Sequence, residues 1–265
     1  MYVVKVGGKV LDSNLVNVVA SISRVASQNP LVVVHGGGNV VTKFCERLGV
    51  EPKFVTSPEG IRSRYTDKDE LEVYVMVMAG KLNKEIVSGL VVRGVKAVGL
   101  TGADGPALLA ERKKRIIIID ERGRKRVIDG GYTGKVVGVN SEILRTFLNS
   151  GYSVVMAPIA IDNEGNMLNV DADQVAFKIS SSLNAEKLII LTDVPGVFID
   201  GDIVKEIKVG EVEKLINKIG TGMNRKLIEA ANAISEGVRE VVIASGMVND
   251  PMEEVLKGSG TVLRP

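Results

Sequence analysis

The sequence predicts an α/β/α sandwich, in which helices cover both faces of a mainly parallel β-sheet. Short runs rich in β-branched residues, each followed by glycine and then by a helix-like stretch, recur along the chain. This is the pattern of parallel strands joined by crossover helices. The 265 residues contain no low-complexity linker and suffice for one sizeable core. We therefore expect a single domain, residues 1–265, with a shared sheet and two lobes of about residues 1–165 and 166–265.

The expected elements follow one another without long gaps. Apolar periodicity and glycine positions predict strands over residues 2–6, 31–34, 96–100, 116–119, 125–128, 154–158, 188–191 and 240–244, and helices over residues 9–27, 39–48, 67–93, 171–183 and 222–236. The runs at 116–119 and 125–128 flank Asp120–Arg124, with Gly123 in the turn. That arrangement predicts an antiparallel hairpin inserted between the parallel units.

Composition argues against several classes of protein. The formal net charge of +2 is too small to indicate a nucleic-acid partner. The longest apolar runs are strand-sized, far below the roughly 18 residues that a membrane-spanning helix needs. The first residues run directly into a strand pattern without the features of a signal peptide, so we expect a cytoplasmic protein. The single cysteine, Cys45, cannot form an internal disulfide and is expected to be a buried small side chain.

Two glycine turns, Gly7-Gly8 and Gly36-Gly37-Gly38, follow the first two expected strands. Ligands of open parallel sheets bind beyond the carboxyl ends of the strands, and glycine lets a backbone amide approach a phosphate closely. A purely structural turn is the alternative for either one alone, but two turns together favour a polyphosphate site. A dinucleotide fingerprint is disfavoured because Val41 stands where its last glycine is required, and no P-loop string occurs.

Two lysines stand where they could reach an anion at this edge of the sheet. Lys5 lies inside an apolar strand, two residues before Gly7; a side chain that extends to solvent is the alternative. Lys226 lies in the first turns of the helix that begins near Gly222, where the helix dipole favours an anion, although a solvated lysine is possible there too.

Five motifs along the chain resemble the amino-acid kinase family, and they occur in the family's order. They are Lys5-Val6-Gly7-Gly8, Val34-His35-Gly36-Gly37-Gly38-Asn39, Asn169-Val170-Asp171-Ala172-Asp173, Thr192-Asp193-Val194-Pro195-Gly196-Val197 and Gly222-Met223-Asn224-Arg225-Lys226. Together they cover almost the whole chain, so the resemblance is specific although each motif alone is weak. It implies the fold shared with carbamate kinase, an N-terminal lobe for an acyl substrate, a C-terminal lobe for nucleotide, and ATP with Mg²⁺ bound through its phosphates.

Within the family the chain is most similar to the acetylglutamate kinase branch, which phosphorylates a side-chain carboxylate. The resemblance implies that Lys5 and Lys226 stabilise the transferred phosphoryl group and that Asp173 holds both lysines. It implies substrate contacts at Gly36, Gly37, Arg62, Arg64 and Asn169, nucleotide contacts at Gly7, Gly8, Gly38, Thr192, Asp193, Gly196, Gly222 and Met223, and no metal site made by the protein.

No general base is needed in this chemistry, because a carboxylate is already ionised at neutral pH. We therefore interpret His35, the only histidine, as a hydrogen-bonded structural residue. For Asp193, a turn-forming role before Pro195 is the alternative to a nucleotide contact.

The segment from Gly60 to Asp67 departs from ordinary acetylglutamate kinases by a second arginine, Arg64, followed by Tyr65. It resembles the branch that acts on amino acids attached to the amino-group carrier protein LysW. Members of that branch phosphorylate carrier-linked 2-aminoadipate in lysine synthesis and, in some cases, carrier-linked glutamate in arginine synthesis. An ordinary acetylglutamate kinase is the alternative.

Positive charge is concentrated around the expected hairpin. Between Glu111 and Arg126 eight basic residues stand against three acidic ones, an excess of five positive charges, whereas the rest of the chain is net −3. Such a patch could steer an acidic partner such as the carrier protein. The alternative is a solvated hairpin whose charges prevent aggregation; nucleic acid is disfavoured because no aromatic residues interleave with the basic ones.

Other assignments fit less well. Isopentenyl phosphate kinase is expected to have a catalytic histidine after the glycine-rich turn, and no histidine follows His35. Aspartate kinase and glutamate 5-kinase commonly carry further C-terminal domains, for which this chain has no room. A noncatalytic nucleotide-binding regulatory subunit is the alternative from another class, and the intact lysine and aspartate motifs argue against it. By resemblance we expect a homodimer or a larger assembly.

Overall fold

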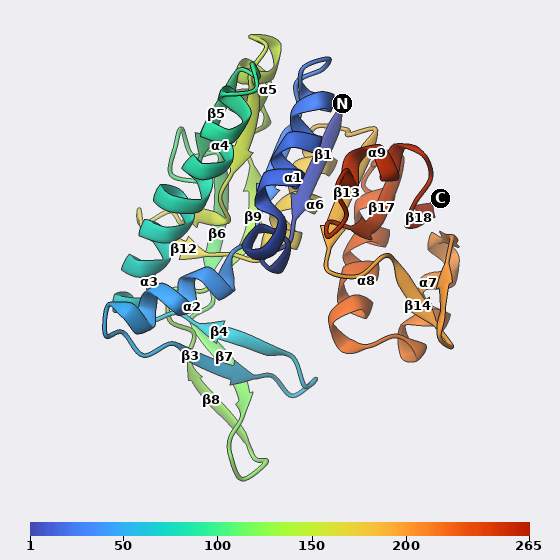
Figure 1. Cartoon of the computed structure of the whole chain (residues 1–265). Helices are drawn as coiled ribbons and strands as arrows, with labels where there is room; N and C mark the ends of the chain where they lie inside the picture. Colours follow the sequence, from blue (N-terminus) through green and yellow to red (C-terminus); the bar gives the residue numbers. More distant parts are fainter.

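The computed structural model describes residues 1–265, apart from the side chains of Asn217 and Thr221. Its centre is an eight-stranded sheet in the order β16-β18-β17-β13-β1-β2-β10-β5 (Figure 1). The strands are β1 (Tyr2–Val6), β2 (Val32–His35), β5 (Ala97–Leu100), β10 (Ser153–Met156), β13 (Lys187–Thr192), β16 (Glu206–Lys208), β17 (Glu240–Ser245) and β18 (Thr261–Arg264). Within this sheet only the β17–β18 pairing is antiparallel, so the predicted sandwich with a mainly parallel sheet is confirmed.

Helices cover both faces of this sheet. They are α1 (Gly8–Ala26), α2 (Gly38–Arg47), α3 (Lys68–Val75), the π-helix η1 (Met76–Leu82), α4 (Asn83–Val91), α5 (Ser141–Asn149), α6 (Ala172–Ser182), α7 (Val212–Leu215), α8 (Thr221–Ser235) and α9 (Pro251–Leu256), with short 3₁₀ turns η2 (Val209–Glu211) and η3 (Ile216–Lys218) beside α7. None of the helices that the structure describes has the length and apolar character needed to cross a membrane.

The alternation of side chains along β1 assigns the two faces. Val4 and Val6 pack in a cluster with α1, α4 and α9, whereas Val3 packs on the opposite side with α5, α6 and α8. Because both faces are covered, the central strands are apolar along most of their length, as is usual in parallel sheets. Lys5 lies on the same side of β1 as Val3 and therefore faces α6 and α8. The central strand thus directs one charged side chain into an otherwise apolar layer.

Antiparallel elements were predicted only in part. The hairpin of β7 (Arg115–Ile119) and β8 (Lys125–Asp129) is confirmed, and Gly123 takes a φ of +73° in its turn. A second hairpin, β3 (Lys53–Thr56) with β4 (Arg62–Tyr65), extends from the same end of the molecule (Figure 1). The sequence also did not indicate the hairpin of β14 (Val197–Ile199) and β15 (Asp202–Val204), or a four-stranded sheet of β6 (Leu108–Arg112), β9 (Gly134–Val139), β11 (Ile159–Ile161) and β12 (Met167–Asn169).

The helix expected over residues 67–93 forms, but it is not one regular α-helix. Asp67 caps its start by accepting a hydrogen bond from the backbone N–H of Glu70 at 3.0 Å. The π-helix η1 then separates α3 from α4. π-segments of this kind often mark functional sites, and η1 lies against one of the glycine turns described below.

Two polar predictions for the core are confirmed. Cys45 is fully buried. His35, at the end of β2, is also fully buried, and its Nδ1 lies 3.0 Å from the carbonyl oxygen of Gly36. Since a carbonyl only accepts, Nδ1 carries the proton and Nε2 faces the Asn83 amide at 3.5 Å. Burial lowers the pKa of His35 to about 4, although the hydrogen bond to the Gly36 carbonyl acts to raise it. The ring is therefore neutral at pH 7.

The buried ring predicts a pH-dependent stability. Because the pKa of His35 is lower in the folded chain than its ordinary value of 6.5, only the unfolded chain takes up a proton as the pH falls from 6.5 towards 4. The folded state should lose roughly 3 kcal/mol over this range from His35 alone. Denaturant unfolding of the wild type and of His35→Asn at pH 7.0, 5.5 and 4.5 isolates this loss, since other groups titrate in both proteins. Equal pH slopes in the two proteins would contradict the prediction.

Candidate active site

The two glycine turns lie against one another at the carboxyl ends of β1 and β2. A Cβ atom added to Gly36 would stand 2.9 Å from the backbone nitrogen of Gly8, and one added to Gly8 would stand 2.9 Å from that of Gly37. Gly8 and Gly36 therefore have no room for side chains of their own where the turns meet. Helices α1 and α2 begin here, with Gly7 and Gly37 as their N-cap residues, and neither has a side-chain cap. Their first amides remain directed toward a common edge that suits an anion.

Gly37 also makes close contact with the π-helix. Its φ is +152°, and an added Cβ would lie 2.2 Å from Leu82 Cδ1 and 3.0 Å from Met78 Sδ. Both of these side chains belong to η1 and are buried. The turn thus needs glycine for its backbone conformation and for the space that η1 occupies.

Lys5, Asp173 and Lys226 come together beside these turns from three separate elements. Lys5 belongs to β1, Asp173 lies in the first turn of α6, and Lys226 belongs to α8. Nζ of Lys5 forms an ion pair with Oδ1 of Asp173 at 2.7 Å, and Nζ of Lys226 donates to Oδ2. All three side chains are largely buried. The structure therefore joins the three residues that were predicted to act together.

Local capping explains the position of Asp173. Asp171 ends the preceding segment and accepts hydrogen bonds from the backbone N–H groups of Asp173 and Gln174, at 2.8 and 3.2 Å. Its other oxygen lies 3.2 Å from Nη2 of Arg225, the residue before Lys226. The Asp171–Arg225 ion pair thus connects the start of α6 to the start of α8, and it holds the two helix ends that carry Asp173 and Lys226.

The cluster has more positive than negative charge. Burial alone would raise the pKa of Asp173, but the charges of Lys5 and Lys226 outweigh it and hold that pKa well below its usual range. Burial alone would lower the pKa of Lys5, but the charge of Asp173 outweighs burial, and the pKa of Lys5 is raised. The pKa of Lys226 is lowered, because burial and the positive charge of Lys5 outweigh the effect of Asp173. One carboxylate thus compensates one ammonium group. The second ammonium leaves these three groups with a net positive charge, which a phosphoryl group would balance.

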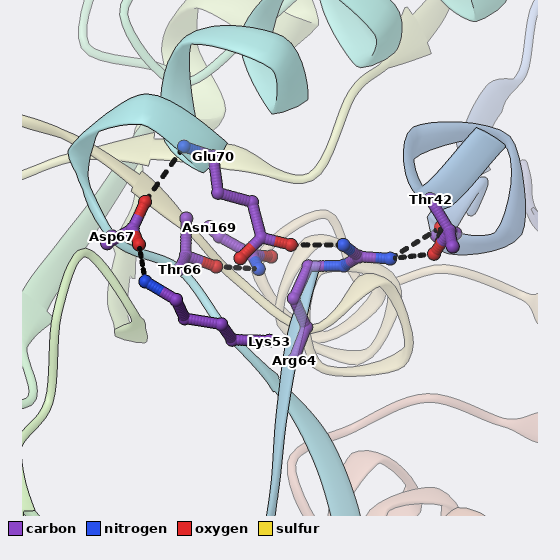
Figure 2. A network of polar contacts seen from close by, with 8 residues as sticks. Thr42, Lys53, Arg64, Thr66, Asp67, Glu70 and Asn169 are labelled. Atoms are coloured by element: carbon purple, nitrogen blue, oxygen red, sulfur yellow. Dashed lines mark hydrogen bonds and ion pairs between the residues drawn. The ribbon is translucent and has the colours of Figure 1, made fainter. Parts of the chain in front are cut away.

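Of the residues expected to contact substrate, Arg64 is held most firmly. It extends from β4 to the start of α2, where its Nη2 donates to the carbonyl of Gly38 at 2.7 Å and to Oγ1 of Thr42 at 2.6 Å (Figure 2). Its Nη1 donates to Glu70. Arg64 therefore joins the β3–β4 hairpin to the second glycine turn.

The other two expected substrate residues lie in different surroundings. Asn169, at the end of β12, donates from Nδ2 to Oγ1 of Thr66 at 2.8 Å, within the network that Figure 2 draws around Arg64. Arg62 is exposed, and its guanidinium lies 4.2 Å from the centre of the Phe54 ring. The structure thus brings Arg64 to the glycine turn but not Arg62, which stays on the hairpin surface.

The residues expected to contact nucleotide fall into two groups. Thr192 ends β13, which pairs with β1, and its Oγ1 donates to Asp193 at 3.1 Å. Asp193 accepts a hydrogen bond from Lys9 in the first turn of α1 at 2.7 Å, and this bond lowers the pKa of Asp193. Gly222 and Met223 lie in the first turn of α8, before Lys226, and nothing lies within 4 Å of a Cβ added to Gly222.

Gly196 has a structural reason to be glycine. An added Cβ would stand 2.7 Å from Oγ1 of Thr261 and 3.0 Å from a side-chain atom of Ile203. The same threonine hydroxyl accepts a hydrogen bond from the N–H of Val197 at 2.8 Å. The close packing of this loop against β18 therefore requires the absence of a side chain.

Four residues of the site were not predicted: Lys9, Thr42, Thr66 and Glu70. Lys9 follows Gly7-Gly8 directly, so its place in the first turn of a helix was a usable signal. Thr42, Thr66 and Glu70 carry no such signal. They meet Arg64 and Asn169 only because β4, α2, α3 and β12 converge in space.

Comparisons with known proteins show the family to which the chain belongs. The model of the amino acid kinase family matches residues 1–245. A LysW-aminoadipate/LysW-glutamate kinase of Sulfolobus acidocaldarius is 53% identical over 264 residues, which are 99% of this chain and 100% of that protein. A protein of the same name from Metallosphaera sedula is 49% identical over 262 residues, 98% of this chain and 99% of its own.

Solved structures show the same fold. A crystal structure from Streptococcus mutans has a TM-score of 0.79 at 26% identity and covers 99% of this chain and 98% of its own. Carbamate kinase from Giardia lamblia bound to AMP-PNP has a TM-score of 0.70 at 16% identity, with coverages of 99% and 98%, and supports the fold alone. The expected carbamate kinase-like form of the sandwich is thereby confirmed. With a family match over most of its length and relatives at about half identity, this chain belongs to the amino acid kinase family.

Proposed function

We propose that this protein uses ATP to phosphorylate the side-chain carboxylate of 2-aminoadipate, and also of glutamate, carried on the protein LysW. The product is an acyl phosphate on the path to lysine and arginine. The observation that supports phosphoryl transfer is the buried cluster of Lys5, Asp173 and Lys226 beside two glycine turns. The choice of substrate is supported by the names of relatives that match this chain over nearly its full length.

In the proposed reaction an oxygen of the substrate carboxylate attacks the γ-phosphorus of ATP. The bond from that phosphorus to the oxygen bridging it to the β-phosphorus breaks, and ADP leaves with the electron pair. Both reactants are anions, so the main barrier is charge repulsion, and no proton has to move. Lys5 and Lys226 would neutralise the charge on the transferred phosphoryl group, while Asp173 keeps their ammonium groups in place.

We propose that the two lobes divide the binding. The N-terminal lobe, to about residue 165, would hold the acyl substrate through the Gly36-Gly37 amides, Arg62, Arg64 and Asn169. The C-terminal lobe would hold nucleotide around Thr192, Asp193, Gly196, Gly222 and Met223, with phosphates reaching Gly7, Gly8 and Gly38. Mg²⁺, which neutralises phosphate charge when it is bound, would be held through the phosphates, because the central carboxylate of the site is already engaged by two lysines.

The carrier protein would dock on the β7–β8 hairpin. The segment from residue 111 to residue 126 has the excess of five positive charges, and the residues of its turn are exposed. The hairpin lies beside β3–β4, which carries Arg62 and Arg64 (Figure 1). An acidic carrier seated there would bring its attached amino acid to the same end of the molecule as the glycine turns.

We propose in addition a cytoplasmic homodimer or larger assembly. The α3–η1–α4 helix carries exposed apolar side chains at Met76, Val91 and Val92, which are 55%, 53% and 78% exposed. Exposed apolar side chains along one helical segment would be covered by a contact with a second copy.

A comparison of substrates tests the proposed function directly. Acyl phosphate trapped with hydroxylamine is measured with carrier-linked aminoadipate, carrier-linked glutamate and free acetylglutamate. We expect kcat/KM for the carrier-linked substrates to exceed that for acetylglutamate by a factor on the order of 100, because carrier contacts add to binding. Efficient turnover of acetylglutamate alone would replace the proposal by an ordinary acetylglutamate kinase.

The two lysines can be tested with ATP binding as a second readout. Lys5→Met or Lys226→Met should lower kcat by about 100-fold or more, since one stabilising charge in the transition state is lost, while ATP still binds. Lys178→Met is the matched control: Lys178 lies on α6 and pairs at 2.8 Å with Glu236 beside α8, away from Asp173. Unchanged turnover in both site variants would rule out the mechanism, whereas ATP binding without turnover in the wild type would favour a noncatalytic subunit.

Docking on the hairpin predicts a selective response to charge and salt. Arg122→Glu with Lys125→Glu should raise KM for the carrier-linked substrate several-fold and leave KM for ATP unchanged, and raised ionic strength should act the same way on the wild type. Lys205→Glu with Lys214→Glu reverses the same number of exposed charges on the opposite lobe and serves as control. Similar effects of both double variants, or equal salt sensitivity of the two substrates, would contradict docking there.

A further inference from the structure

Glu70 is a completely buried carboxylate that the phosphoryl transfer does not use. It lies in the first turn of α3, and its exposed fraction is 0%. One oxygen accepts a hydrogen bond from Arg64, while the other, Oε2, is buried and has no hydrogen-bond partner among the residues that the structure describes. Burial raises the pKa of Glu70, and the charge of Arg64 opposes this rise. Arg64 is thus the cation that stabilises this carboxylate in its ionised form.

Stability alone does not account for this pair. Taking two charges out of water costs several kcal/mol, and well-packed apolar residues often serve the fold equally well. Glu70 leaves one oxygen unsatisfied, which adds to the cost. A buried ion pair with an incomplete set of hydrogen bonds therefore indicates a role in orienting its partner.

The group that Glu70 orients is the guanidinium of Arg64. Both protons of its Nη2 are engaged, by the carbonyl of Gly38 and by the hydroxyl of Thr42, and Glu70 holds Nη1 from another direction (Figure 2). Three contacts from α2 and α3 fix the plane of the guanidinium at the start of α2. Nε and the second proton of Nη1 remain as donors for a ligand.

The nearby Lys53–Asp67 pair provides a contrast within the same network. Lys53 donates to Asp67 at 2.7 Å, and Asp67 caps α3 (Figure 2). This pair is more exposed, with side-chain fractions of 51% and 30%, and it makes no contact with Arg64. An exposed ion pair of this kind contributes little to stability. Its carboxylate holds the backbone of Glu70 through the helix cap, but the Lys53 side chain bonds Asp67 and not the Glu70 carboxylate.

We propose that Glu70 is a positioning residue, which holds the guanidinium of Arg64 at the Gly38 turn so that Arg64 can bind the acyl substrate. The inference rests on the proposed function, because it concerns the substrate side of the same site. Glu70 does not touch substrate. Its loss should act on acyl-substrate binding through Arg64 and leave the nucleotide side unaffected.

Glu70→Gln tests this with little change of shape. The neutral amide removes the charge that holds Arg64, so KM for the acyl substrate should rise about tenfold while KM for ATP stays within about twofold. Thr42→Val, which removes another contact of Arg64 at nearly constant volume, should shift the same constant in the same direction and provides the test where Glu70→Gln folds poorly. Calorimetry of acyl-substrate binding without ATP gives a second readout that does not require turnover.

Lys53→Gln is the matched control and should leave both KM values unchanged. Each variant is assayed with the carboxylate substrate that the wild type phosphorylates. An error in the proposed substrate therefore appears in the wild type, whereas an error about Glu70 appears only in the comparison of the variants with the wild type. The positioning role is overturned if Glu70→Gln and Thr42→Val keep the acyl-substrate KM within about twofold, if both substrates weaken equally, or if Lys53→Gln reproduces the effect.

Discussion

The carboxylate of Asp173, held between the ammonium groups of Lys5 and Lys226, is the interaction on which the site depends. Three charges are taken largely out of water, and each lysine is tolerable there only because the carboxylate is close. The arrangement is not neutral, since one positive charge is left over. A bound phosphoryl group would complete the balance, so the resting protein already has the charge distribution that a transferring phosphoryl group requires.

A parallel sheet is what allows three distant residues to meet in this way. Lys5 comes from the central strand, whose opposite face is filled by valines against α1, while α6 and α8 cover the face of Lys5. The glycine turns that follow β1 and β2 lie at the same edge, so amides and ammonium groups converge without any long loop. The core packing and the proposed chemistry are therefore consequences of one topology.

The parts predicted from sequence are those encoded locally. The strand before Gly7-Gly8 and the turn at Gly123 follow from β-branched runs and glycine, and the structure contains both. The β3–β4 hairpin was missed because Lys53–Thr56 and Arg62–Tyr65 are short and largely polar, with too few apolar residues for alternation to show. Glu70 could not be found at all. A glutamate in the first turn of a helix is ordinary, and only tertiary packing buries it beside Arg64.

The structure separates the transfer centre from the surfaces that would recognise the acceptor. Lys5, Asp173 and Lys226 are fixed by the sheet and its covering helices. Arg64 belongs to the β3–β4 hairpin, and most of the basic residues between 111 and 126 belong to the β7–β8 hairpin, at one end of the molecule (Figure 1). Under the proposed function, a change in the hairpins would alter which carboxylate is presented without disturbing the charges proposed to stabilise transfer. Arg64 is where the two parts meet, because it is bound at once to the glycine turn and to Glu70. The orientation of this one guanidinium would then couple recognition of the acyl group to the edge where the phosphates lie.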